Sequence, residues 1–202
     1  MVATALKKEL LTVEEYFEIE KDGDARHEFY HGEIFVMGNT TKNHNEIIDN
    51  IKTPLRKAFV PKGCKVYSES IRLQVAKGKF YTYPDIMLTC DKRDQEGNEY
   101  MVAYPVLIVE VLSKTTSGRD HDFKWKHYKK LPSLQYYMMV SQYSISVELF
   151  TRIEGKKFWH YQYFESMDDV IELKKLGFSI PVKSIYENIK ILPENENGEI
   201  AG

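Results

Sequence analysis

Two carboxylates lie inside runs that otherwise have the composition of buried strands. Residues 105–112 read Pro-Val-Leu-Ile-Val-Glu-Val-Leu and contain Glu110, and the shorter run 83–88 contains Asp85. A near-continuous apolar run is typical of a central strand of a sheet. An ionised carboxylate there is unfavourable by several kcal/mol unless a cation or hydrogen bonds compensate it. A shared divalent metal ion is the simplest explanation for both acids.

The two acids differ in strength as candidates. A Pro-Asp pair is common at strand starts and turns, so Asp85 alone would more often be structural. Glu110 is different, because an acid in the middle of residues 106–112 has no ordinary structural role there. We therefore take Glu110 as the strongest single candidate for function.

The length and composition favour one compact domain. The chain has 202 residues, 43% of them hydrophobic and 29% charged, which suits a single α/β domain over residues 1–202 with a loose tail at 193–202. No run approaches the roughly 18 apolar residues of a membrane span, and residues 1–11 lack a secretory pattern. We expect a cytoplasmic protein without membrane association. Cys64 and Cys90 are far apart and lack metal-type spacing, which favours reduced thiols.

The overall charge gives no support for nucleic-acid binding. A formal net charge of -2 lacks the basic excess that such proteins usually show on one face. A balanced total can still hide a basic patch, and the densest basic segment lies at residues 119–130. Such a segment is more often the solvated face of a helix.

The periodicity of apolar residues predicts mixed helices and strands. Thr12 and Glu15 form a capping-box pattern at a helix start, and Pro54 should kink or end the second helix. Residues 91–98 read as a charged loop. Helices are expected at 13–19, 43–59, 117–131 and 184–189. Strands are expected in a hairpin at 26–37, then at 65–75, 80–89, 106–112, 135–140, 146–151 and 158–164.

One lysine of the third helix is predicted to face inward. At about 100° per residue, Tyr128 and Leu131 fall on the same side as Lys124. The other cationic side chains project to the opposite side: Arg119, Lys126, Lys129 and Lys130. A buried ammonium needs an anion nearby, and Glu110 is the closest in sequence.

Asp85, Glu110 and Lys124 together suit metal-assisted hydrolysis of a phosphodiester. Carboxylate oxygens are the hard ligands that Mg²⁺ prefers, and it commonly takes only one or two from a protein. A lysine nearby could orient the attacking water or stabilise the charged transition state. The three residues therefore predict a magnesium-dependent hydrolase site.

The same residues resemble a known family, the PD-(D/E)XK restriction-endonuclease-like superfamily, in the order Pro84-Asp85, Glu110, Lys124. More narrowly, the chain resembles the branch labelled "putative restriction endonuclease", formerly a domain of unknown function. The motifs that carry this are Tyr81-Thr82-Tyr83-Pro84-Asp85, residues 105–113, Asp120 with Lys124 and Tyr128, and Leu131-Pro132-Ser133-Leu134-Gln135.

The resemblance implies a fold, a cofactor and partners. It implies a central mixed β-sheet flanked by helices, with an extra N-terminal hairpin. It also implies a DNA endonuclease that uses Mg²⁺, with Mn²⁺ able to substitute, held by Asp85 and Glu110. Many members are homodimers because cutting a duplex needs two sites, and the aromatic residues Tyr136, Tyr137, Phe158 and Trp159 could supply an exposed interface.

The chain departs from the superfamily pattern at one position. The usual lysine two residues after the acid is replaced by Leu112, and the resemblance places its substitute at Lys124, the residue that the helical face also selects. The resemblance further implies Glu28 and His44 as residues of the cleft. From the residues alone, Glu28 could face solvent in a hairpin, and His44 could be a core histidine or an N-terminal cap.

Two further residues have open roles. Glu69 could be a third acid facing Asp85 or a charge on an edge strand. Tyr128 is more readily a packing residue with a local hydrogen bond than a catalyst. The leading function is a Mg²⁺-dependent DNA endonuclease. The alternatives are an inactive nuclease fold that binds nucleic acid or protein, and a metal hydrolase acting on a small molecule.

Overall fold

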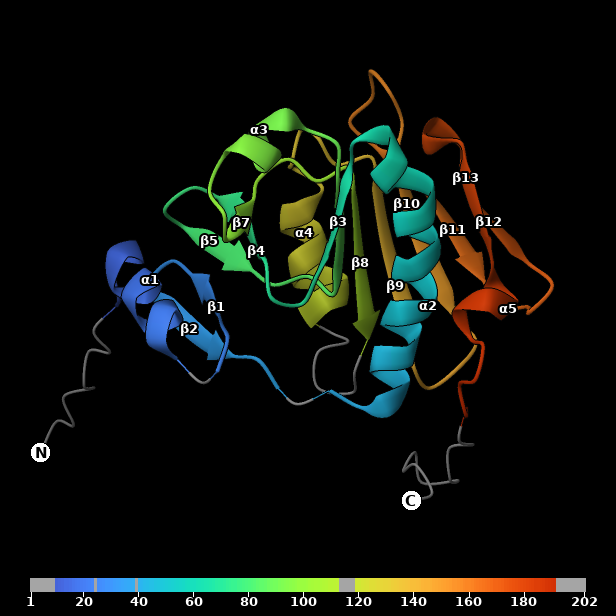
Figure 1. Ribbon diagram of the computed structural model, residues 1–202, viewed down its shortest axis with the longest axis horizontal. Coiled ribbons are helices and arrows are strands. Elements are labelled where there is room, and N and C mark those ends of the chain that lie inside the picture. Colours follow the sequence, from blue (N-terminus) through green and yellow to red (C-terminus); the bar gives the residue numbers. More distant parts are fainter. Residues whose placement is uncertain (1–9, 24, 39, 113–118, 192–202) are drawn as a thin grey trace, which may run out of the picture.

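The computed structural model describes residues 10–23, 25–38, 40–112 and 119–191 (Figure 1). Its helices are α1 (Val13–Asp22), α2 (Lys42–Phe59), α3 (Lys92–Glu96), α4 (Trp125–Tyr128) and α5 (Val182–Ile185), with 3-10 turns η1 (Val60–Lys62) and η3 (Lys174–Leu176) and a π-helical turn η2 (Arg119–Lys124). The first strands are β1 (His27–Tyr30), β2 (Glu33–Val36), β3 (Lys65–Ser68), β4 (Arg72–Ala76), β5 (Phe80–Thr82) and β6 (Ile86–Thr89). The others are β7 (Met101–Val102), β8 (Leu107–Leu112), β9 (Tyr136–Ser141), β10 (Val147–Arg152), β11 (Trp159–Phe164), β12 (Val170–Leu173) and β13 (Phe178–Pro181).

The strand that carries Glu110 lies in the middle of the larger sheet. That sheet has six strands in the order β11-β10-β9-β8-β6-β3, and β8 is parallel to β9 and antiparallel to β6. Residues 107–111 of β8 are all buried, as expected for a strand covered on both faces. The predicted mixed sheet flanked by helices is therefore confirmed.

Helix α2 covers one face of this sheet. Its buried residues, His44, Ile47, Ile48, Ile51, Leu55 and Phe59, are the predicted apolar stripe continued by one more member. Thr41 caps the helix by accepting a hydrogen bond from the backbone N–H of His44 at 3.1 Å. The expected interruption at Pro54 is not an end, because the helix continues to Phe59. Leu55 and Phe59 belong to the main core cluster, so packing holds the turn that follows the proline.

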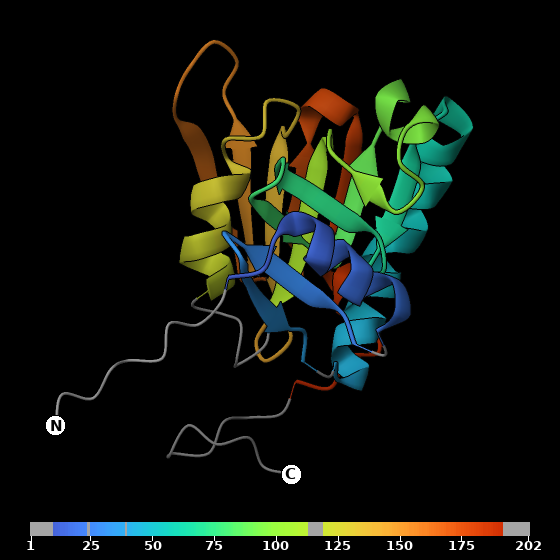
Figure 2. The same ribbon diagram turned by 90° about the vertical axis from the view of Figure 1, so that its left-hand side faces the viewer.

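The opposite face is covered by α4 and by a second sheet (Figure 2). This sheet has five strands in the order β2-β1-β5-β4-β7. The predicted hairpin is present as β1 and β2, with the turn at His31 and Gly32. It is integrated through β1, which pairs with β5, and helix α1 packs on it around Tyr16, Phe29 and Tyr81. The capping box of Thr12 and Glu15 begins α1 as predicted.

The stretch 65–89 forms four strands, so the prediction of two strands was wrong in number. The chain leaves β3 at Glu69, whose φ of 52° is left-handed, and it leaves β5 at Tyr83-Pro84. Strands β3 and β6 belong to the six-stranded sheet, whereas β4 and β5 belong to the five-stranded one. Asp85 therefore lies where the chain returns to the larger sheet.

Other differences are local. Residues 91–98 contain the short helix α3, because Asp91 caps it and the buried Asp94 accepts hydrogen bonds from the backbone of Ala103 and Tyr104. The hairpin of β12 and β13 was not predicted, and the last helix is α5 at Val182–Ile185 instead of 184–189. The third helix is a π-helical turn followed by α4. Its predicted first residues, 117 and 118, and the predicted tail at 193–202 lie outside the described residues.

Two of the aromatic residues expected at a dimer interface are in the core. Tyr136 and Tyr137 lie in β9, a central strand, and are buried. Phe158 is exposed, and Trp159 is partly buried against α4. Among the helices of the described part, none is long and apolar enough to cross a membrane.

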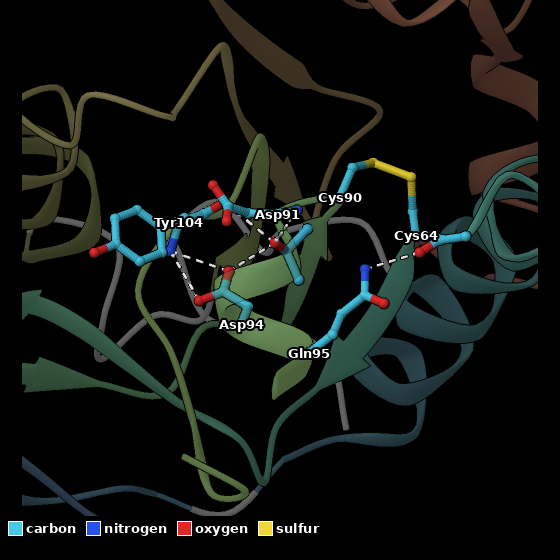
Figure 3. The surroundings of a disulfide bond; sticks show 8 residues. Cys64, Cys90, Asp91, Asp94, Gln95 and Tyr104 are labelled. Carbon is cyan, nitrogen blue, oxygen red and sulfur yellow. Dashed lines mark hydrogen bonds between the residues drawn. A yellow bond between two sulfur atoms is a disulfide. The ribbon is translucent and has the colours of Figure 1, made fainter. Parts of the chain in front are cut away.

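The two cysteines form a disulfide bond, so the prediction of reduced thiols was wrong (Figure 3). Lys65 of β3 is paired with Thr89 of β6, and extending this antiparallel register by one residue places Cys64 opposite Cys90. Their Cα atoms are 4.2 Å apart. Gln95 of α3 also donates a hydrogen bond to the carbonyl oxygen of Gly63 at 2.8 Å. The pairing was invisible in the sequence because 26 residues and two strands of the other sheet separate the cysteines.

We expect the Cys64→Ala/Cys90→Ala variant to lose about 3 kcal/mol of unfolding free energy, because the bridge restricts a long loop of the unfolded chain. Urea denaturation at pH 7 measures the difference. Dithiothreitol should lower the stability of the wild type to the same level and leave the variant unchanged. Two thiols that react with Ellman's reagent in unfolded, never-reduced protein would contradict the bridge.

Candidate active site

Asp85 and Glu110 lie opposite each other at one end of the β6–β8 pair. Ile86 is paired with Val109, so the next pair in this antiparallel register is Asp85 with Glu110. Both side chains are buried. The carboxylate oxygen Oδ2 of Asp85 accepts a hydrogen bond from the backbone N–H of Val111 at 2.6 Å, which fixes it beside the backbone of β8. The structure thus brings together the two acids that the sequence singled out.

Lys124 reaches this end of the sheet from the turn that precedes α4. Its Nζ lies 3.1 Å from Oε1 of Glu110 and 3.0 Å from Oε1 of Glu28. The side chains are only 7%, 4% and 8% exposed, respectively, so all three charges are largely removed from water. The predicted inward orientation of Lys124 is correct. The predicted outward side of the helix is also correct for Lys126, which is exposed.

Glu28 is a buried partner of Lys124 rather than a solvent-facing acid. It lies in β1, whose central residues Glu28 and Phe29 are buried because β1 is flanked by β2 and β5. The ion pair with Lys124 connects the five-stranded sheet with the helix on the larger sheet. Hairpins of this kind usually expose acids, so only the family resemblance pointed to Glu28.

Tyr128 holds Glu110 from the other side. Its hydroxyl donates to Oε1 of Glu110 at 3.0 Å and is 2.8 Å from Oγ1 of Thr82. Burial, followed by the negative charge of Glu110, raises the pKa of Tyr128 well above its ordinary value. The tyrosine therefore stays protonated and acts as a donor. Thr82, at the end of β5, was not predicted, because nothing in its sequence context distinguishes it.

His44 lies against Asp85 at the N-terminal end of α2. Its Nε2 is 3.3 Å from Oδ1 of Asp85, and its buried Nδ1 has no hydrogen-bond partner within the described part. Burial by itself lowers the pKa of His44, but the hydrogen bond and charge of Asp85, with the charge of Glu69, outweigh it and raise the pKa overall. The cap of α2 is Thr41, so His44 is not the capping residue.

Glu69 lies close enough to the site for its charge to act on His44. It is half-buried and has a left-handed backbone just after β3 ends at Ser68. The predicted alternation along a strand therefore does not apply to it. Its position supports a third acid near Asp85 more than a charge on an edge strand.

Gln142, which the sequence did not suggest, ties α2 to the end of β8. Its Nε2 donates to the carbonyl oxygen of Leu112 at 3.1 Å, and its Oε1 accepts a hydrogen bond from the hydroxyl of Thr41. Thr41 in turn caps α2 beside His44. The buried amide thereby fixes the end of α2 from which His44 reaches Asp85.

The donor set fits a hard divalent cation of low protein coordination. Asp85 and Glu110 supply two buried carboxylates on opposite strands, and Mg²⁺ often takes only one or two, with water completing its shell. In the described ranges, no group of three or more His, Cys, Asp or Glu residues is arranged to hold a metal ion. A structural zinc or calcium cage is therefore a poor match.

Comparisons with known proteins agree with this geometry. Residues 13–183 match the family model Uma2, described as "Putative restriction endonuclease". The chain belongs to the Uma2 family. It is 32% identical over 179 residues to the uncharacterized protein slr1290 of Synechocystis sp. (strain ATCC 27184 / PCC 6803 / Kazusa), covering 89% of this chain and 93% of that protein. It is 31% identical over 160 residues to the uncharacterized protein sll1609 of the same organism, covering 79% and 89%.

A solved structure shares the fold. It is described as a putative nuclease belonging to DUF820 from Anabaena variabilis ATCC 29413, with a TM-score of 0.70 at 16% identity, covering 87% of this chain and 97% of that one. The predicted resemblance to the restriction-endonuclease-like superfamily is confirmed. Membership in the Uma2 family places the chain among nuclease-like proteins.

In this Uma2 family member, we expect Lys124→Met to lower the free energy of unfolding by about 3–5 kcal/mol, because Glu28 and Glu110 would lose a buried cation. Urea denaturation at pH 7 measures the change. Lys126→Met, on the exposed side of the same helix, is the matched control and should stay within about 0.5 kcal/mol of the wild type. Adding Glu28→Gln to Lys124→Met should recover part of the loss. Equal losses for the two lysine variants would contradict the buried cluster.

Proposed function

We propose that this protein is a Mg²⁺-dependent DNA endonuclease, with Mn²⁺ able to replace Mg²⁺. The observation that carries the proposal is the pair of buried carboxylates, Asp85 and Glu110, opposite each other with Lys124 bonded to Glu110. The family description supports the nuclease class, and DNA as the substrate follows from that description. Asp85 and Glu110 would hold the metal ion.

Each protein group has a definable part in phosphodiester hydrolysis. A bound Mg²⁺ would supply Lewis acidity and lower the pKa of a coordinated water molecule. Lys124 carries a positive charge where a phosphate would develop negative charge, and its ammonium can donate to water or to a phosphate oxygen. Tyr128 and Thr82 hold Glu110 in position, while the backbone N–H of Val111 holds Asp85.

The protein already compensates both acids with its own cations, and this favours a second candidate function. His44 lies on Asp85, and Lys124 lies between Glu110 and Glu28. Such a network could persist without chemistry in a nuclease fold that only binds nucleic acid or protein. Metal binding distinguishes the two functions, because only the enzyme needs a cation to compete with His44 and Lys124.

The proposal includes a homodimer, since cutting both strands of a duplex requires two sites. Tyr136 and Tyr137 cannot form its interface because they are buried, which leaves Phe158 as the exposed member of the expected aromatic set. Lys126, Lys129 and Lys130 are exposed on the outer side of the helix that carries Lys124, and they could contact DNA phosphates.

We expect the wild type to nick or cut plasmid DNA with Mg²⁺ or Mn²⁺, and Asp85→Asn and Glu110→Gln each to reduce the rate by about 100-fold or more. Gel electrophoresis of time courses measures the rates. Glu46→Gln, which alters an exposed acid of α2, is the control and should retain activity. Each variant is checked by circular dichroism, so that a folded but inactive protein can be recognised. Cleavage that survives both site substitutions would disprove the assignment.

Metal binding should depend on the same acids. At a Mn²⁺ concentration of about 100 times its Kd, binding should stabilise the wild type by about 2.7 kcal/mol and raise its Tm. Glu110→Gln should show no such rise, whereas Glu46→Gln should behave as the wild type. Differential scanning calorimetry with and without Mn²⁺ measures the shift. A folded wild type whose Tm does not respond to either metal would favour the non-catalytic function.

A further inference from the structure

A row of exposed tyrosines extends the face of the larger sheet beyond helix α4. In β11, the last strand of that sheet, Trp159, Tyr161 and Tyr163 are paired with Arg152, Phe150 and Glu148 of β10. Directly paired residues project from the same face of a sheet. Tyr161 and Tyr163 are 49% and 51% exposed, although large aromatic residues normally avoid such exposure in a packed sheet.

These rings rest on a firm aromatic base. The ring of Trp125 from α4 is 4.2 Å from that of Phe150 and 5.0 Å from that of Trp159. The ring of Phe150 is 5.0 Å from that of Tyr161, whose hydroxyl also interacts with Glu148. Helix α4 therefore covers part of the aromatic surface and leaves its outer part open.

Cationic side chains border this surface on two sides. On α4, Lys126, Lys129 and Lys130 are exposed, and Nζ of Lys129 lies 5.7 Å from the ring centroid of Trp125. The turn between β10 and β11 adds Lys156 and Lys157, also exposed.

Arg152 joins the two basic groups. Its guanidinium donates to the carbonyl oxygens of Lys129, Leu131 and Leu134, so it links the end of α4 to the start of the β10–β11 turn. The acids in this region are Glu148 and Glu154, against five exposed lysines. The border is therefore positive although the whole chain is slightly acidic.

The surface lies in register with the candidate active site. Glu110 is paired with Met139, Met139 with Glu148, and Glu148 with Tyr163. The four residues form one cross-strand row on one face. With strands about 4.8 Å apart, Tyr163 is roughly 14 Å along this row from Glu110. A nucleic-acid strand of a few nucleotides is long enough to reach from one to the other.

We propose that the surface formed by Tyr161, Tyr163 and the adjacent lysines binds unpaired nucleotides, so that the substrate of the site contains a single-stranded segment. Flat exposed rings stack on the faces of unpaired bases, which a duplex hides, and lysines attract the phosphates between them. This inference rests on the proposed nuclease function for the identity of the reaction, but the binding surface is independent of the metal site.

The test compares the binding of fluorescein-labelled oligothymidine and of a duplex of the same length by anisotropy, with EDTA present to prevent cleavage. The wild type should bind the single strand more tightly than the duplex. Tyr161→Ala/Tyr163→Ala should raise the Kd for the single strand at least about tenfold, because it removes two stacking rings. Tyr161→Phe/Tyr163→Phe keeps the rings and should stay within about threefold of the wild type.

Tyr100→Ala is the matched control, because Tyr100 is a similarly exposed tyrosine outside this surface and its loss should change nothing. The surface assignment is overturned if the alanine pair binds the single strand as the wild type does, or if the duplex binds as tightly. It is also overturned if no oligonucleotide binds and the alanine pair instead dissociates a dimer in sedimentation experiments, because the tyrosines would then contact a second copy of the chain.

A separate cleavage assay with Mg²⁺ keeps the two proposals distinguishable. Tyrosine-dependent binding without any cleavage would remove the nuclease function and leave the surface intact. Cleavage that is abolished by Glu110→Gln but insensitive to the tyrosines would support the nuclease and remove the surface.

Discussion

The burial of Lys124 between Glu110 and Glu28 holds together parts of the chain that have no other reason to meet at this point. Glu110 belongs to the six-stranded sheet, Glu28 to the five-stranded sheet, and Lys124 to the turn before α4. A buried ion pair seldom adds net stability over apolar packing, because desolvation offsets the attraction. Stability alone therefore does not explain why three charges are kept here. A requirement for charged groups at this position does.

The candidate site consists of two compensated acids rather than one open cluster. Asp85 faces His44 from α2, while Glu110 faces Lys124, and the two carboxylates meet only through the pairing of β6 with β8. Each acid is thus neutralised by a cation from a different helix. Because neither acid needs a metal to remain buried, the fold does not depend on one. A divalent cation could enter by displacing either contact, which would free His44 or Lys124 to meet a substrate.

Features that depend on neighbouring residues were predictable, whereas features that depend on strand pairing were not. The capping box of α1 and the inward side of Lys124 follow from helical spacing, and they are observed. Cys64 and Cys90 meet only because β3 pairs with β6 across two strands of the other sheet. Glu28 is buried for a similar reason, since β5 covers β1. No local pattern encodes such a register, so the sequence could identify the site's acids but not all of their partners.

Helix α4 and the turn before it connect the site with the outer surface of the sheet. Lys124 and Tyr128 face Glu110, Trp125 packs on Phe150 of β10, and the lysines project to solvent. The turn before α4 is π-helical, and the extra residue in such a turn changes the angle between the side chains on either side of it. A rotation of α4 would move the ammonium away from Glu110 and Trp125 away from Phe150 at the same time. The position of the helix is therefore constrained from both ends, and the open face of β11 lies beside an element that the site itself holds in place.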